Sequence, residues 1–98
     1  MDLVFKGSDL KKLFENPNYD GGYAPGIVKA FRKRVNFIQS ALDQRDIRAI
    51  RGNRLEKLKG RGDEHSIRLN DQWRLILTFE TAKDGAKQAV LHGIEDYH

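Results

Sequence analysis

The sequence contains no cysteine, only two prolines and no long apolar run. Without cysteine the chain forms no disulfide and offers no thiolate to a metal, as is typical of proteins from a reducing cytoplasm. The histidines, His65, His92 and His98, lack zinc-ligand spacing, so we expect no metal site. Neither a signal peptide nor the roughly 20 apolar residues of a membrane helix is recognisable. We therefore expect a cytoplasmic protein that makes no contact with a membrane.

The length and composition predict one small folded unit. Ninety-eight residues fit a single domain, residues 1–98, and leave no room for a dinucleotide-binding fold or a second domain. With 39% hydrophobic and 33% charged residues, the chain is typical of soluble globular proteins rather than disordered ones.

Positive charge is concentrated in the middle of the chain. Residues 29–61 contain eleven cationic and three acidic side chains, a net +8, which leaves −4 for the rest of a chain of net charge +4. Such a segment indicates either a solvated helix surface or a surface that binds a polyanion or an acidic partner. The excess continues past the predicted helix into the following loop, and at this point both interpretations stay open.

The clearest periodicity predicts a long helix that begins near Pro25, a residue suited to a first helical turn. Its apolar residues follow spacings of three and four and form one core-facing stripe: Ile27, Phe31, Val35, Ile38 and Leu42. Before it, residues 3–6 are predicted as a strand, and Ser8 as the cap of a short helix over residues 9–16. Residues 16–26 are rich in helix breakers and predict a loop.

From residue 65 onward the hydrophobic period changes to two, which predicts strands over residues 65–69 and 72–80. A shorter strand is predicted over residues 54–60, after a basic connection that adds about one helical turn. The last strand is predicted over residues 89–98 and follows a turn at Asp84-Gly85. One face of that strand is expected to hold Val90, His92, Ile94, Asp96 and His98.

The loop between the strands over 65–69 and 72–80 decides which residues face each other. A two-residue loop would place Ile67 opposite Arg74, mixing core and charge on one face. A three-residue loop keeps together Ile67, Leu69, Trp73, Leu75, Leu77 and Phe79. This second register makes Arg68 and Arg74 cross-strand neighbours on the opposite face, which is unfavourable unless an acid or anion lies near them. The predicted architecture is α+β, with two N-terminal helices packed on one face of an antiparallel sheet and the other face partly open.

RNA cleavage without a metal needs a base for the 2′-hydroxyl, cations for the phosphoryl charge and an acid for the leaving 5′-oxygen. Histidine suits the proton transfers and arginine suits the phosphate. The candidates in this chain are Lys59, Arg74, Asp96, Tyr97 and His98. Each also has an ordinary structural interpretation, since terminal histidines, strand arginines and lysines beside glycine are usually solvated surface residues.

Three stretches of this sequence, "GNRLEKLKG", "HSIRLNDQWRLILTFE" and the terminal "EDYH", resemble the HigB branch of the RelE/ParE toxin superfamily, including its GraT-type members. The likeness covers most of the chain from about residue 42, and the two earlier helices fit more loosely. The combination of S-I-R-x-N-D-Q-W-R with a terminal D-Y-H is specific, although neither half is decisive alone.

The resemblance implies a RelE-like fold and a toxin of a type II toxin–antitoxin system. Such toxins cleave messenger RNA in the ribosomal A site, and the resemblance implies chemistry without a metal or other cofactor. The implied partners are a HigA-type helix-turn-helix antitoxin, the ribosome and messenger RNA, with operator DNA reached only through the antitoxin. The implied catalytic residues are Lys59, Arg74, Asp96, Tyr97 and His98. The basic residues predicted to contact RNA are Arg32, Lys33, Arg48, Arg61 and Arg68.

The chain departs from the family pattern at two acidic residues. Glu56 stands where many relatives have a histidine, and it could act as a base while also repelling phosphate. Glu95 stands where relatives often have an apolar residue. Two other functions remain alternatives: a non-catalytic poison, as ParE-type relatives act on gyrase, or a basic module that binds only RNA or an antitoxin. Neither alternative needs the catalytic set, so its presence favours the nuclease.

Overall fold

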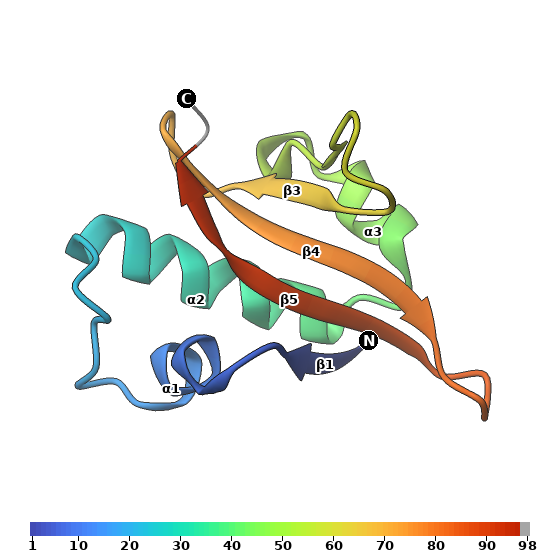
Figure 1. The fold of residues 1–98 in the computed structure, drawn as a ribbon, viewed down its shortest axis with the longest axis horizontal. Coiled ribbons are helices and arrows are strands. Elements are labelled where there is room, and N and C mark those ends of the chain that lie inside the picture. Colours follow the sequence, from blue (N-terminus) through green and yellow to red (C-terminus); the bar gives the residue numbers. More distant parts are fainter. Residues whose placement is uncertain (97–98) are drawn as a thin grey trace.

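The computed structural model describes residues 1–96, and its frame is a five-stranded sheet in the order β1-β5-β4-β3-β2 (Figure 1). The strands are β1 (Asp2–Phe5), β2 (Glu56–Lys57), β3 (His65–Arg68), β4 (Trp73–Thr81) and β5 (Lys87–Asp96). All neighbours pair antiparallel except β1, which runs parallel to β5. The antiparallel arrangement predicted for the whole sheet is therefore wrong at this edge. No hairpin fixes the direction of β1, because most of the chain separates it from β5.

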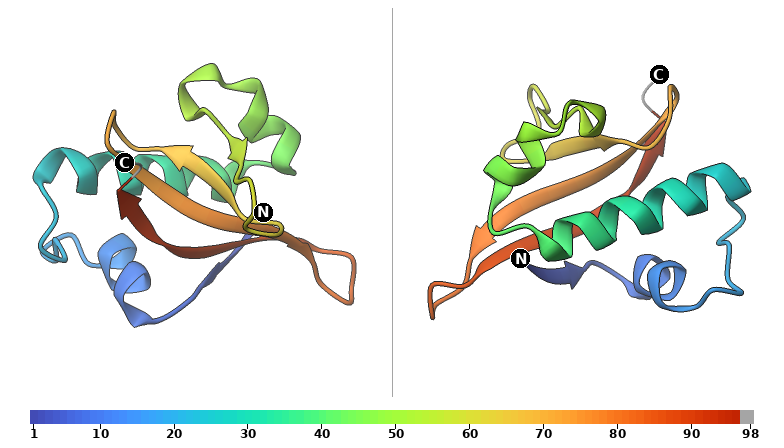
Figure 2. Two further views of the ribbon diagram at one scale, coloured as in Figure 1. Left: turned by 45° about the horizontal axis from the view of Figure 1, so that its top comes forward. Right: turned by 180° about the vertical axis from the view of Figure 1, so that it is seen from behind.

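The short helix α1 (Ser8–Glu15) and the long helix α2 (Pro25–Ser40) cover one face of the sheet, as Figure 2 shows from behind. The α+β class with helices on one face is thus confirmed. The extra turn predicted after them is a separate helix, α3 (Gln44–Ala49), followed by the 3₁₀ turn η1 (Arg51–Asn53) near β3. Within residues 1–96, no helix is both long and apolar enough to cross a membrane.

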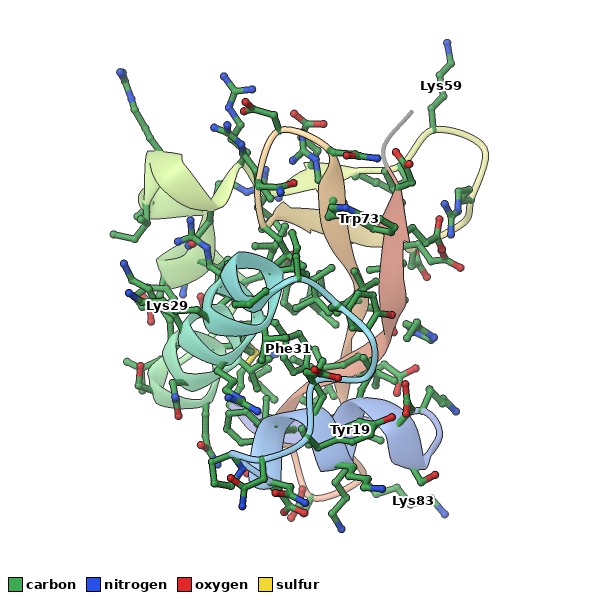
Figure 3. The ribbon with its side chains drawn as sticks, turned by 90° about the vertical axis from the view of Figure 1, so that its left-hand side faces the viewer. Tyr19, Lys29, Phe31, Lys59, Trp73 and Lys83 are labelled. Atoms are coloured by element: carbon green, nitrogen blue, oxygen red, sulfur yellow. The ribbon has the colours of Figure 1, made fainter. Side chains whose placement is uncertain are left out.

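The apolar stripe of α2 forms the centre of the core. Its residues from Ile27 to Ile38 are buried, and Phe31 lies between α2 and the sheet (Figure 3). Leu42 was predicted to continue this stripe, but its side chain is 82% exposed. The helix ends at Ser40, and Ala41 has an extended backbone with φ −72° and ψ 148°. The helical geometry on which the stripe depends therefore stops before Leu42.

Helix α1 begins one residue earlier than predicted. Ser8 is its first residue, and Gly7 occupies the cap position with φ 82° and no side-chain capping bond. The prediction that Ser8 caps this helix is wrong. Glycine suits the position because a positive φ is costly for other residues.

The β3–β4 hairpin has the predicted register. Ile67 pairs with Leu75 and Arg68 with Arg74. The Asn70 side chain accepts hydrogen bonds from the backbone N–H groups of Gln72 (2.8 Å) and Trp73 (2.7 Å), which closes a three-residue loop. The six apolar side chains assigned to one face all belong to the core or pack against it.

A bulge breaks the alternation predicted for the last strand. Gly93 lies opposite Ile76 and Leu91 lies opposite Leu77, so His92 is an extra residue on β5. Val90 and Ile94 consequently fall on opposite faces of the sheet, and their predicted common face is wrong. The bulge also places Glu95 opposite Arg74, and Asp96 opposite Trp73.

Candidate active site

The candidate site lies on the face of the sheet that no helix of residues 1–96 covers, which is turned toward the viewer in Figure 1. Strand alternation directs Ser66, Arg74 and Ile76 to this face. All three are nonetheless buried, with Arg74 only 5% exposed. Two residues of loop 58–64, Leu58 and Arg61, lie against them. The predicted open face is therefore partly roofed by this loop.

A hollow of about 130 Å³ lies here and is partly open to solvent. Its lining residues are Leu58, Arg61, Ser66, Arg74, Ile76, Glu95 and Asp96. Larger hollows lie elsewhere, for example between Met1 and α1. This hollow, however, is lined by two predicted catalytic residues, Arg74 and Asp96.

Arg74 is held by strand pairing and by a contact with the backbone just before β2. One guanidinium nitrogen, Nη1, lies 3.5 Å from the carbonyl oxygen of Arg54, a long hydrogen bond. The cross-strand neighbour Arg68 forms an ion pair with Asp71 in the hairpin loop. Glu95 lies opposite Arg74 on the other side. The two adjacent arginines thus have the nearby acids that their like charge requires.

Glu95 is bound by Arg61 through both of its carboxylate oxygens. Nη1 of Arg61 donates to Oε1 at 2.8 Å, and Nη2 donates to Oε2 at 2.8 Å. Nη2 also donates to Glu64 at 2.6 Å. The hydrogen bonds from Arg61 hold the pKa of the Glu95 carboxyl below its usual range, and the two carboxylates raise the pKa of Arg61. Both members of the pair are ionised at neutral pH.

The other predicted catalytic residues are less fully placed. Asp96 accepts a hydrogen bond from Nε2 of Gln72 at 2.9 Å and is one of the residues that line the hollow. Lys59 is exposed in loop 58–64, and its side chain extends away from the sheet (Figure 3). Tyr97 and His98 lie outside the described residues. The structure therefore groups Arg74 with Asp96 and keeps the Lys59 side chain outside the hollow.

The five residues predicted to contact RNA do not form one surface. Arg61 and Arg68 lie on the candidate-site face, whereas Lys33 and Arg48 are exposed on α2 and α3. Arg32 serves the fold, since its guanidinium donates to the backbone oxygens of three residues. These acceptors are Leu13 (3.0 Å), Asn16 (2.9 Å) and Tyr19 (2.9 Å).

Glu95 was not among the residues predicted for the site. The signal that could have located it was the expected pairing of two arginines, which called for a nearby acid. Glu56 also reaches this face, because it pairs with Ser66 across β2 and β3. Within residues 1–96, no three histidine, aspartate or glutamate side chains gather closely enough to hold a metal ion.

Comparison with known proteins agrees with this architecture. A structural match is a YoeB/ParE toxin from Agrobacterium tumefaciens, which is 13% identical, with a TM-score of 0.58 over 100% of both chains. At that identity the match shows the fold alone. No curated protein matches the chain. Residues 3–98 match the family model described as the RelE-like toxin of the type II toxin–antitoxin system HigB. The chain therefore belongs to the HigB-like family of type II toxins.

Proposed function

We propose that this toxin is a ribosome-dependent endoribonuclease that cleaves messenger RNA by acid–base chemistry without a metal ion. The observation that carries the proposal is the hollow that is lined both by a buried arginine, Arg74, and by Asp96 at the end of β5. Tyr97 and His98 follow Asp96 directly in the sequence. Arg74 and Asp96 line the hollow, and the last two residues of the sequence continue directly from Asp96, which supports this choice of catalytic residues.

In the proposed reaction, a base removes the proton of the 2′-hydroxyl, and the 2′-oxygen attacks the adjacent phosphorus. Arg74 stabilises the charge that grows on the phosphoryl oxygens. An acid donates a proton to the departing 5′-oxygen, which leaves a 2′,3′-cyclic phosphate on the upstream fragment. We assign the proton transfer to His98, the orientation of His98 to Asp96, and base stacking or proton donation to Tyr97. Lys59 adds positive charge from loop 58–64.

Membership of a toxin–antitoxin family implies an antitoxin partner. We further propose that this partner is a HigA-type helix-turn-helix protein, and that the toxin meets operator DNA only through it. The basic surface of α2 and α3 would then contact either the ribosome or the antitoxin. The proposal of these partners is supported by the family assignment and by the positive charge of residues 29–61.

The test is cleavage of a defined messenger RNA in a translating extract, with cut sites mapped with and without ribosomes. We expect cuts only when ribosomes are present, and a loss of about 10²–10⁴-fold in His98→Ala if His98 transfers a proton. A chain that ends at Tyr97 and cleaves fully would remove His98 from the mechanism. Absence of any cutting, together with inhibition of gyrase supercoiling, would instead support a non-catalytic poison.

A further inference from the structure

The contact between Arg61 and Glu95 has the geometry with which arginine binds a phosphate. Two parallel hydrogen bonds, each 2.8 Å long, join the guanidinium to both carboxylate oxygens. Carboxylate and phosphate present similar pairs of charged oxygens, and the arginine fork binds either in this two-pronged way. Glu95 therefore occupies a position in which Arg61 could hold a phosphate.

The surroundings of Glu95 extend this position into an anion site, which we define by Arg61, Arg74 and Ser66. Arg74 lies opposite Glu95 on the next strand, and all three residues of the site line the same hollow. The Ser66 hydroxyl is fully buried and has no hydrogen-bond partner among residues 1–96. A buried hydroxyl without a partner is costly, and it would gain one if a phosphate oxygen entered the hollow.

The bond between Arg61 and Glu95 is placed where it can open. Their side chains are 40% and 47% exposed, so water competes for both. Exposed ion pairs are weak. Arg61 also stands between Gly60 (φ 76°) and Gly62 (φ 62°), two positive-φ positions in loop 58–64. When Arg61 releases Glu95, the ion pair between loop 58–64 and β5 is broken. Among the described residues it is the one ion pair that joins this loop to β5.

We propose that Glu95 is a built-in competitor for this anion site, and that a phosphodiester of an RNA strand displaces it from Arg61 on binding. The displaced loop 58–64 then admits the strand to Arg74. The choice of RNA as the strand rests on the proposed function, whereas the competition itself rests on the contacts of Arg61 and Glu95. The carboxylate thereby weakens RNA binding and opposes occupation of the site by stray anions.

A permanent structural ion pair is the main alternative to this competition. If the pair only stabilised the fold, its removal would lower stability and leave RNA affinity unchanged or reduced. If Glu95 competes, its removal must raise affinity, because the binding-competent state is then always populated. The direction of the change in affinity therefore separates the two explanations.

The experiment measures binding of a short 2′-O-methyl oligoribonucleotide by fluorescence anisotropy. The methyl group blocks the attacking oxygen, so affinity is read without cleavage. We expect Glu95→Gln to bind about two- to fivefold more tightly than the wild type, the gain that an exposed ion pair can withhold. Glu80→Gln makes the same charge change on β4 and is not a lining residue of the hollow. This control is expected to differ little from wild type.

A double variant tests whether the gain acts through Arg61. In an Arg61→Gln background, Glu95→Gln should give no further gain, since there is no longer a pair to break. A gain that persists there, or an equal gain in Glu80→Gln, would show a general charge effect and overturn the proposal. Unchanged or weaker binding by Glu95→Gln alone would overturn it as well.

Inorganic phosphate distinguishes a strand from a free anion as the occupant. We expect it to displace the oligonucleotide only at concentrations far above those at which the strand binds. Equal affinity would assign the site to free phosphate and overturn the strand assignment. The binding measurements do not depend on whether the toxin cleaves RNA. If Glu95→Gln binds the oligonucleotide more tightly but the wild type cleaves no messenger RNA in the extract, the proposed nuclease activity is wrong and the competition stands. If the wild type cleaves messenger RNA but Glu95→Gln binds no more tightly, the competition is wrong and the nuclease activity stands.

Discussion

At the scale of single residues, Arg74 is the side chain on which the proposed cleavage most depends. It is buried, and it lines the hollow with a side chain that offers a two-pronged guanidinium to a phosphate. We expect Arg74→Ala to lower cleavage by about 10²–10³-fold, by analogy with the loss of a donor to a developing oxyanion. Arg74→Lys should recover only part of the rate, because lysine offers one point charge and no fork.

The matched control for Arg74 is Arg45→Ala, which removes an exposed cation paired with Asp43 outside the hollow. It should cleave like the wild type. Circular dichroism spectra of all three variants would show that each is folded. Normal cleavage by a folded Arg74→Ala would make Arg74 a structural cation of the sheet.

Glu95 gives a prediction about acid stability. Its pKa is lowered in the folded chain, chiefly by the hydrogen bonds from Arg61. A carboxyl whose pKa is lowered by folding stabilises the folded chain at any pH above its unfolded-state pKa of about 4. This stabilisation is lost as the pH falls through the folded-state pKa. Urea unfolding at pH 6 should therefore show Glu95→Gln to be less stable than wild type. At pH 3 the difference should shrink, and a difference that stays constant would contradict the role given to the Arg61 bonds.

At the scale of elements, a buried asparagine joins α2 to the segment formed by α3 and η1. Asn53 is 1% exposed. Its Oδ1 accepts from Nη1 of Arg34 at 2.7 Å, and its Nδ2 donates to the carbonyl oxygen of Ile47 at 2.9 Å. Arg34 also donates to the carbonyl oxygen of Gly52 at 3.1 Å. These bonds hold the basic segment that follows α2 at a fixed position.

We expect Asn53→Ala to lower the free energy of unfolding by about 1–3 kcal/mol, because it leaves buried polar groups without partners. Asn36→Ala is the matched control, since Asn36 is exposed on α2. Urea denaturation of both variants provides the measurement. If the free energy of unfolding of Asn53→Ala lies within about 0.5 kcal/mol of the wild-type value, packing alone holds α3 in place.

The elements that could be predicted from sequence are those governed by local periodicity. The α2 stripe and the β3–β4 register follow from apolar spacing and from the hydrogen-bonding capacity of Asn70. The β5 bulge could not be predicted, because Val90 and Leu91 are both apolar and either can face the core. Nor could the exposure of Leu42, whose N–H is bound by the side chain of Asp46 after α2 has ended.

The candidate site could be predicted only in part for a related reason. The position of Arg74 on the non-core face of the sheet could be predicted from the hairpin register, which is a local property of the chain. Arg61 and Glu95 are 34 residues apart, and their contact depends on the bulge and on the path of loop 58–64. A pattern of residue types does not specify a contact of that kind, although it does indicate that Arg74 requires a nearby acid.

At the scale of the whole molecule, the net charge of +8 over residues 29–61 overstates the charge available to a partner. Arg32 and Arg34 bind backbone or asparagine oxygens inside the fold, and Arg61 is neutralised by Glu95 and Glu64. Lys33 and Arg48 remain exposed on α2 and α3. They are therefore better probes of a binding surface than Arg32, whose replacement would also disturb the end of α1.

We predict that Lys33→Glu combined with Arg48→Glu weakens ribosome association more than antitoxin binding. Contacts to phosphates release counterions, so affinity for RNA falls steeply with salt, by a slope of about 0.7–0.9 per phosphate contact. Loss of two such contacts should lower the slope of ribosome binding by about 1.5. An antitoxin interface of ordinary size retains a large apolar part that salt does not screen, and it should lose less.

The measurement pairs ribosome pelleting with antitoxin titration, each at two salt concentrations. The control is Lys11→Glu combined with Lys83→Glu, which reverses two exposed lysines on α1 and in the β4–β5 turn. Equal losses in both double variants would mean that net charge, not the surface of α2 and α3, sets the affinity. A Lys33 and Arg48 variant that still pellets with ribosomes but no longer binds the antitoxin would assign this surface to the protein partner. In that case RNA contact would be confined to the face that carries Arg61, Arg74 and Glu95.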